Sequence, residues 1–149
     1  MLHAVLGCAV VGAMTHEFVW SLRYLKGRYG GATAERRFLR WAGRLFMGAF
    51  ALGLILYPEY KLNVRLAWLD ARRPAVGRLF DIKEHAAALC CALLLAQLWI
   101  GRKAHPADVK DPLGQIVYVS LAGLNAGLVW FVALVGLYTT THRSFGVGG

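Results

Sequence analysis

The sequence predicts an all-α protein: an integral membrane four-helix bundle in a single transmembrane domain, residues 1–149, with an amphipathic extracytoplasmic loop between helices two and three. Two properties of the chain lead to this fold class. Hydrophobic residues make up 58% of it and charged residues only 17%, whereas a soluble domain has roughly 25% charged residues. The apolar residues are also gathered into four blocks, each close to the length of about 20 residues that crosses a bilayer.

The four blocks predict helices at about 2–22, 41–58, 83–101 and 115–138. The first and fourth suit a span of roughly 17 to 25 residues outright, and the second and third reach that length with their polar flanks. Between Val117 and Tyr138 there is no charged residue, and Asn125 is the one strongly polar side chain. A helix of a soluble bundle would need a polar face for water there. The sequence therefore favours a membrane as the surroundings of the bundle.

The distribution of Lys and Arg predicts the orientation. Ten of these residues lie in the connections 23–44 and 102–114, against seven on the opposite side of a four-span chain. Short loops rich in Lys and Arg stay in the cytoplasm. We therefore expect a multi-pass protein of the cell inner (plasma) membrane with both termini extracytoplasmic. The net charge of +9 is dispersed at the span ends, where snorkelling and anionic headgroups account for it. The bilayer is thus the expected partner, and no nucleic acid is required.

The segment between helices two and three carries a helical pattern of its own. Leu62, Leu66 and Leu69 recur at helical spacing, and Trp68 lies beside them. This pattern predicts a short amphipathic helix on the membrane surface that docks a partner protein. The alternative interpretation is a connector that merely caps the bundle.

Other local patterns concern the remaining connections and the helix contacts. Thr33 is the expected N-cap of a renewed helix after an exposed cytoplasmic turn, with Glu35 near its positive end. Pro106 and Pro112 are expected to end helix three.

Small and polar residues predict contacts between the helices. Gly123 and Gly127 form a GxxxG spacing in helix four. Asn125 and Gln97 are both expected to form hydrogen bonds across helix interfaces.

Ionisable residues collect near the span ends. With the predicted topology, the extracytoplasmic end holds His3, His85, His142 and Glu84. Two neutral imidazoles on facing helices are the usual axial ligands of a b-type haem, and histidine with glutamate also suits a transition metal. A carboxylate beside a histidine could instead move protons to or from a quinone. The simpler alternative is a set of rim histidines that bond headgroups and water. The cytoplasmic end holds His16, Glu17 and His105.

No hydrolase elbow, phosphate loop or zinc-enzyme motif occurs in the chain. The architecture resembles small four-helix membrane subunits of electron-transfer complexes, including cytochrome b type anchors, and this likeness implies a function through fold alone. The expected function is therefore that of an accessory or anchor subunit of a larger membrane redox complex, with other membrane subunits as partners and no catalysis of its own. The alternative is a carrier of electrons or protons that binds haem b or a quinone. A small transporter is a third hypothesis, disfavoured because no broken helix or internal repeat is visible.

Overall fold

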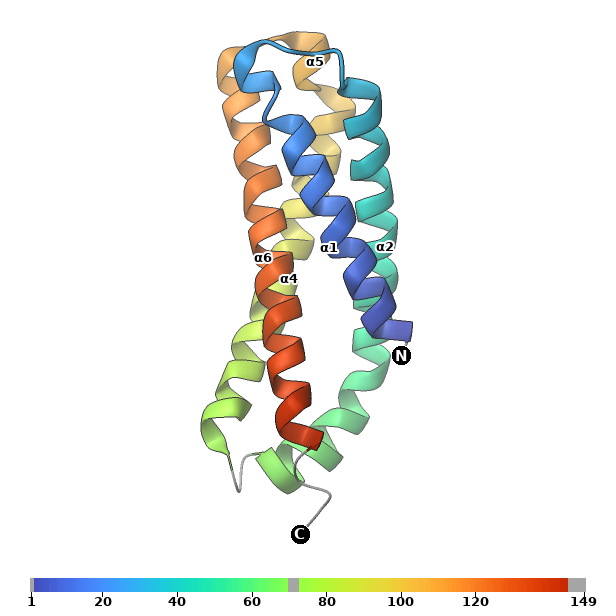
Figure 1. The fold of residues 1–149 in the computed structure, drawn as a ribbon, viewed down its shortest axis with the longest axis vertical. Coiled ribbons are helices and arrows are strands. Elements are labelled where there is room, and N and C mark those ends of the chain that lie inside the picture. Colours follow the sequence, from blue (N-terminus) through green and yellow to red (C-terminus); the bar gives the residue numbers. More distant parts are fainter. Residues whose placement is uncertain (1, 70–72, 145–149) are drawn as a thin grey trace.

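A computed structural model describes residues 2–69 and 73–144, with the side chains of residues 2–66 and 73–141. Four long helices lie side by side and alternate in direction along the chain (Figure 1). These long helices are α1 (Leu2–Ser21), α2 (Ala32–Tyr60), α4 (Pro74–Lys103) and α6 (Pro112–Ser144). The short elements are η1 (Tyr24–Lys26), η2 (Lys61–Leu69) and α5 (Pro106–Val109). The prediction of an all-α protein with four packed helices is confirmed.

Three of the four neighbouring helix pairs around the bundle pack closely, and the pair of α2 and α4 packs less closely. α1 lies against both α2 and α6, and α6 lies against α4. Ala42, Cys90 and Ala122 are fully buried, and these short side chains let the helix backbones approach one another closely. α1 is the shortest of the four, so its first residues lie part-way along the bundle while the other helices continue beyond them (Figure 1).

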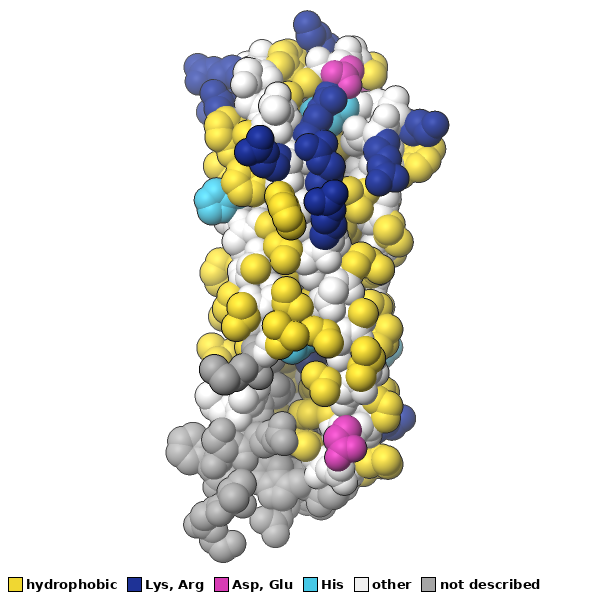
Figure 2. All heavy atoms as spheres, turned by 90° about the vertical axis from the view of Figure 1, so that its right-hand side faces the viewer, with side chains coloured by type: hydrophobic (Ala, Val, Ile, Leu, Met, Phe, Trp, Pro, Cys, Tyr) yellow, Lys and Arg dark blue, Asp and Glu magenta, His cyan; other side chains and the backbone are white. Residues whose placement is uncertain are grey.

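Much of the surface of the bundle suits hydrocarbon. Three segments are long and apolar enough to cross a membrane by length and composition: Leu2–Lys26, Ala32–Leu66 and Pro112–Thr141. Large apolar side chains stand outward over this region, as at Ile55 and Leu137, which are 72% and 65% exposed. Figure 2 shows hydrophobic side chains over the middle of the molecule and Lys and Arg side chains gathered at the end where α2 begins. A multi-pass membrane protein fits this surface.

The helices are longer than the hydropathy pattern indicates. The second begins at Ala32 rather than at 41, the third at Pro74 rather than at 83, and the fourth extends to Ser144. The reason is that hydropathy marks the part of a helix that suits hydrocarbon, whereas the hydrogen-bonded backbone continues through its polar flanks.

The cap predictions were also wrong in detail. Gly31, not Thr33, is the N-cap of α2, and no side chain bonds the helix end there. By contrast, the third helix does stop before Pro106, since α4 ends at Lys103, and Pro106 and Pro112 also begin α5 and α6. A proline suits a first helical position because it has no N–H to be left unpaired.

The predicted surface helix after α2 is present, but it is not a separate element. Lys61 follows Tyr60 without a break, and η2 continues α2 as a wider, π-type helix. Arg65 in η2 forms a two-pronged ion pair with Asp81 of α4, with N···O distances of 2.6 and 2.8 Å. The rings of Tyr60 and Phe80 stack beside it, with 4.4 Å between their centroids. These contacts hold η2 against α4.

Most residues of the first connection are exposed, as the sequence predicts, but Tyr24 and Gly31 are buried. A Cβ atom added at Gly31 would lie 2.3 Å from Cε3 of Trp20, closer than any side chain allows. Gly27 has φ of +65°, a value that glycine adopts at little cost. Tyr24, between these points, is 1% exposed. The connection therefore delivers a tyrosine into the interior of the bundle.

Candidate functional site

The bundle interior near the first and third connections is polar. Six side chains from all four long helices and both of these connections meet there, and each is at most 2% exposed. We call this group the carboxyl cluster: Glu17, Tyr24, Glu35, Gln97, His105 and Tyr118. Ionisable residues buried inside a helical bundle are candidates for function, because they are costly to keep there.

Glu35 is the centre of the carboxyl cluster. Its Oε1 accepts a hydrogen bond from the Tyr118 hydroxyl at 2.5 Å. Its Oε2 accepts from the Tyr24 hydroxyl at 3.2 Å and lies 2.8 Å from Nε2 of His105. Glu35 also stands in the first turn of α2, where the helix dipole favours negative charge. This environment suits an ionised carboxylate.

The contacts of His105 fix which of its nitrogens carries the proton. Nδ1 accepts a hydrogen bond from the backbone N–H of Ala107 at 3.2 Å. An imidazole nitrogen that accepts a bond carries no proton, so the proton of the neutral ring is on Nε2. His105 therefore donates to Glu35, and its ring also packs edge-on against both Tyr24 and Tyr118.

Glu17 extends the carboxyl cluster toward the middle of the bundle. Its Oε1 accepts from Nε2 of Gln97 at 2.7 Å, and its carboxyl group also lies in hydrogen-bond contact with Glu35. Oε1 of Gln97 accepts from Nδ2 of Asn125 at 2.8 Å, and Oδ1 of Asn125 accepts from the Cys90 thiol at 3.6 Å. The prediction that Gln97 and Asn125 bond across helix interfaces is confirmed. Cys90, Asn125 and Gln97 thus each donate to the next residue along a path that leads to Glu17, beside Glu35.

Sequence reasoning placed Glu35 correctly near the positive end of a helix, but it missed that the side chain is buried. In the structure, Glu35 is fully buried and lies on the same face of α2 as the buried residues Leu39, Ala42 and Phe46. Their spacing is that of one helix face, and it continues back from the apolar block to Glu35. That continuation was the available signal. Its partner His105 gave no comparable signal, because it stands alone in a connection.

The residues predicted at the opposite end are arranged differently. His85 is exposed, and its Nδ1 bonds the backbone oxygen of Asp81 at 2.8 Å. His3 is exposed and lies beside Gly53 of α2. Glu84 is half-buried and bonds Tyr57. His142 belongs to α6 by its backbone, but its side chain lies outside the described residues.

Over residues 2–66 and 73–141, whose side chains are described, no three His, Cys, Asp or Glu side chains are grouped closely enough to hold a metal ion. An axial pair for a haem needs only two histidines, so this finding leaves the haem hypothesis as a prediction.

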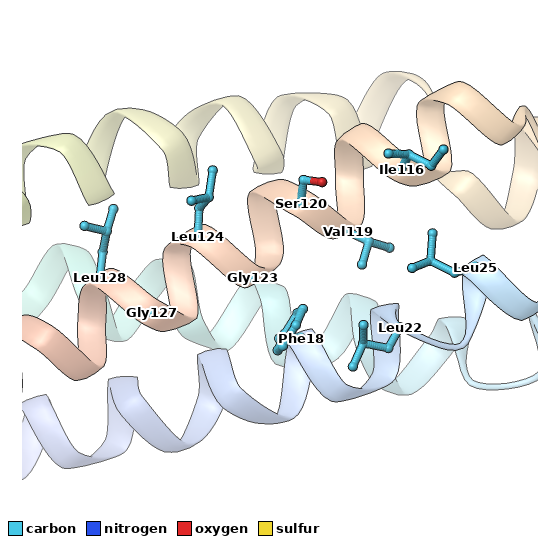
Figure 3. Close-up of a pocket in the computed structure, with 10 residues that line it drawn as sticks. All are labelled: Phe18, Leu22, Leu25, Ile116, Val119, Ser120, Gly123, Leu124, Gly127 and Leu128. Atoms are coloured by element: carbon cyan, nitrogen blue, oxygen red, sulfur yellow. The ribbon is translucent and has the colours of Figure 1, made fainter.

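A shallow groove runs along the outer surface between α1 and α6 (Figure 3). A Cβ added at Gly123 would lie 3.0 Å from Cε2 of Phe18, whereas one added at Gly127 would meet nothing within 4 Å. The close approach at Gly123 and the open space at Gly127 shape the groove. Among its described lining residues Ser120 is the polar one, so the groove suits hydrocarbon chains.

No protein-family model matches this chain, and neither does any of the known proteins or solved structures compared with it. Its class is defined by its own residues: a helical protein with candidate transmembrane helices and a buried cluster of carboxyl, imidazole and phenol groups.

The two tyrosines of the carboxyl cluster provide a matched test of the Glu35 environment. Tyr118→Phe removes the 2.5 Å bond to Glu35, and hydrogen bonds to charged groups contribute about 1.5–3 kcal/mol. Tyr24→Phe removes the longer 3.2 Å bond, so its cost should be lower, about 1 kcal/mol. The free energy of unfolding in detergent micelles measures both. Equal costs, or a larger cost for Tyr24→Phe, would contradict the picture of an ionised Glu35 held chiefly by Tyr118.

Proposed function

We propose that the protein is a small integral membrane accessory or anchor subunit of a larger membrane redox complex. The observation that carries this proposal is the carboxyl cluster, a sealed group of protonatable side chains at membrane depth. Buried carboxylates and histidines in membrane helices are retained where protons or ions are handled. Reactions such as quinone reduction take up protons together with electrons, so a subunit that holds protons beside a redox partner has a clear use.

The interior of the bundle supports an accessory role more than catalysis by this chain alone. The side chains of the carboxyl cluster bond one another, and the groove between α1 and α6 is shallow and apolar. Enzyme sites are usually concave pockets with a few converging polar groups. The polar groups here converge on Glu35 rather than on an open pocket.

In the proposed arrangement all four long helices span the membrane, with α4 crossing at about residues 83–101. The end with the carboxyl cluster faces the cytoplasm, because Lys and Arg side chains gather there (Figure 2) and such residues are retained on the cytoplasmic side. Both termini and η2 then lie on the extracytoplasmic side of the inner membrane.

The segment 61–69 is the proposed docking surface for a partner subunit. Leu62 and Leu66 are 62% and 53% exposed on η2. Trp68 and Leu69, predicted to belong to the same surface, have side chains outside the described residues. The clamp between Arg65 and Asp81 would hold this surface in a fixed position, which favours binding because less order is then lost.

A second candidate function is a bundle that carries a b-type haem at the extracytoplasmic end. The bond from Nδ1 of His85 to the Asp81 oxygen favours it, because ligating histidines commonly donate their other ring N–H to a backbone carbonyl. Nε2 of His85 would then coordinate the iron. His3 or His142 would supply the other ligand, with Glu84 as a neighbouring charge.

Single cysteines should report the orientation in a variant whose own cysteines are replaced. We expect Asn63→Cys to react with a membrane-impermeant maleimide added to intact cells, and Gly30→Cys to react only after the cells are opened. Asn63 and Gly30 are both exposed, and a Cβ at Gly30 meets nothing within 4 Å. The opposite labelling pattern would reverse the proposed topology.

A polar substitution on η2 tests the docking surface. Leu66→Asp places a charge on an exposed apolar position, so it should release the co-purifying partner and leave the bundle folded. Leu137→Asp, on the exposed face of α6, is a control for a general effect of an added surface charge. Retention of every co-purifying protein after Leu66→Asp would exclude this surface as the docking site.

The visible spectrum of the purified protein tests the haem candidate. A bound b-type haem should give its absorption bands in the wild type, and His85→Ala should abolish them while the amount of folded protein stays the same. His16→Ala is the matched control, because its Nδ1 also bonds a backbone oxygen four residues earlier. A wild type reconstituted with haem that shows no bands would eliminate this candidate and leave the accessory-subunit proposal standing.

A further inference from the structure

Two carboxyl groups in hydrogen-bond contact need a proton between them, and the carboxyl cluster shows where it belongs. Glu17 and Glu35 touch through their side chains. Glu35 already accepts from the Tyr118 and Tyr24 hydroxyls and from Nε2 of His105. A carboxylate that accepts several hydrogen bonds favours its ionised form. The partner acid must then be the donor.

The surroundings of Glu17 complete this assignment. Gln97 donates to Oε1 of Glu17, and Gln97 is held in that orientation because its oxygen accepts from Asn125. Oε1 is therefore the carbonyl oxygen, and Oε2 can carry the proton that is donated to Glu35. Like charges in contact disfavour a state in which both groups ionise.

We propose that Glu17 and Glu35 form a buried proton-binding site, which holds one proton on Glu17 at neutral pH and exchanges protons through His105 with solvent at the end of the bundle that carries α5. This inference concerns the ligand of the carboxyl cluster, a proton, and depends on neither a partner subunit nor a haem. The groups that face the acid pair are Tyr24 from η1, Gln97 from α4, His105 before α5 and Tyr118 from α6. Arg36, the next residue of α2, is a nearby cation that interacts electrostatically with the Tyr24 side chain.

His105 is placed to connect the pair with the surface. Its Nε2 touches Glu35, and its Nδ1 touches the backbone of α5, where Asp108 and Val109 are exposed. In the exchange step, the bond from Ala107 opens and a solvent proton binds Nδ1. The Nε2–H bond then breaks as its proton passes to Oε2 of Glu35. This leaves a neutral imidazole with its proton on Nδ1 and two protonated carboxyls, and release follows the reverse path.

Infrared spectroscopy of the purified protein tests the site directly. A protonated carboxyl group has a carbonyl band separate from those of carboxylates and amides, and the band shifts in D₂O. Glu17→Gln should remove this band from the neutral-pH spectrum and leave the protein folded. The substitution is matched to the protonated acid, because the glutamine oxygen still accepts from Gln97 and its amide still donates to Glu35. If the band persists in Glu17→Gln, or if the wild type has none at neutral pH, the proposed proton site is wrong.

The rate at which the carbonyl band shifts in D₂O tests whether protons reach the acid pair through His105. His105→Gln keeps a donor for Glu35 but cannot relay a proton, so the shift should be slower by about 10²-fold, the typical contribution of a positioned proton-transfer group. His16→Gln is the control. His16 directly precedes Glu17 in the sequence, but its side chain is exposed and stacks on Phe38. An unchanged rate in His105→Gln would reject His105 as the route. Equal slowing in His16→Gln would do the same.

Discussion

One buried carboxyl group, Glu35, sets the arrangement of the loop end of this bundle. A charge removed from water costs several kcal/mol unless hydrogen bonds replace its hydration. Its donors come from η1, the α4–α5 connection and α6, and α2 itself adds the positive end of its dipole. Because each donor must reach the same two oxygens, the positions of three separate segments are fixed relative to one another.

The connections at this end follow from that requirement. Tyr24 reaches Glu35 only because the chain turns back directly after α1, and the absence of a side chain at Gly31 allows α2 to begin against Trp20. His105 is brought inward by the one-turn helix that follows it, whose backbone N–H also selects its tautomer. Local backbone geometry thus determines which nitrogen faces the acid pair.

The opposite end of the bundle has a different physical character. There, α1 no longer covers the other helices (Figure 1), and histidines stand exposed instead of being enclosed by donors. The ion pair of Arg65 with Asp81 and the stacked rings of Tyr60 and Phe80 hold η2 in place. Exposed leucines on a fixed segment suit contact with another molecule, whereas a sealed cluster suits the storage of a proton. The two ends therefore support separate roles in one small protein.

The sequence by itself determined the all-α class, the four helices and the polar contacts of Asn125 and Gln97. These follow from local properties: block hydropathy reports the segments that suit hydrocarbon, and a lone amide in an apolar helix must find a partner. Only the tertiary structure decided the carboxyl cluster. Glu35 meets His105 and Tyr118 across separations of 70 and 83 residues, and no local pattern encodes such a meeting. Hydropathy also averages a single buried acid with its polar neighbours, so the burial of Glu35 at the start of its helix was not predicted, although its helix face continues the core.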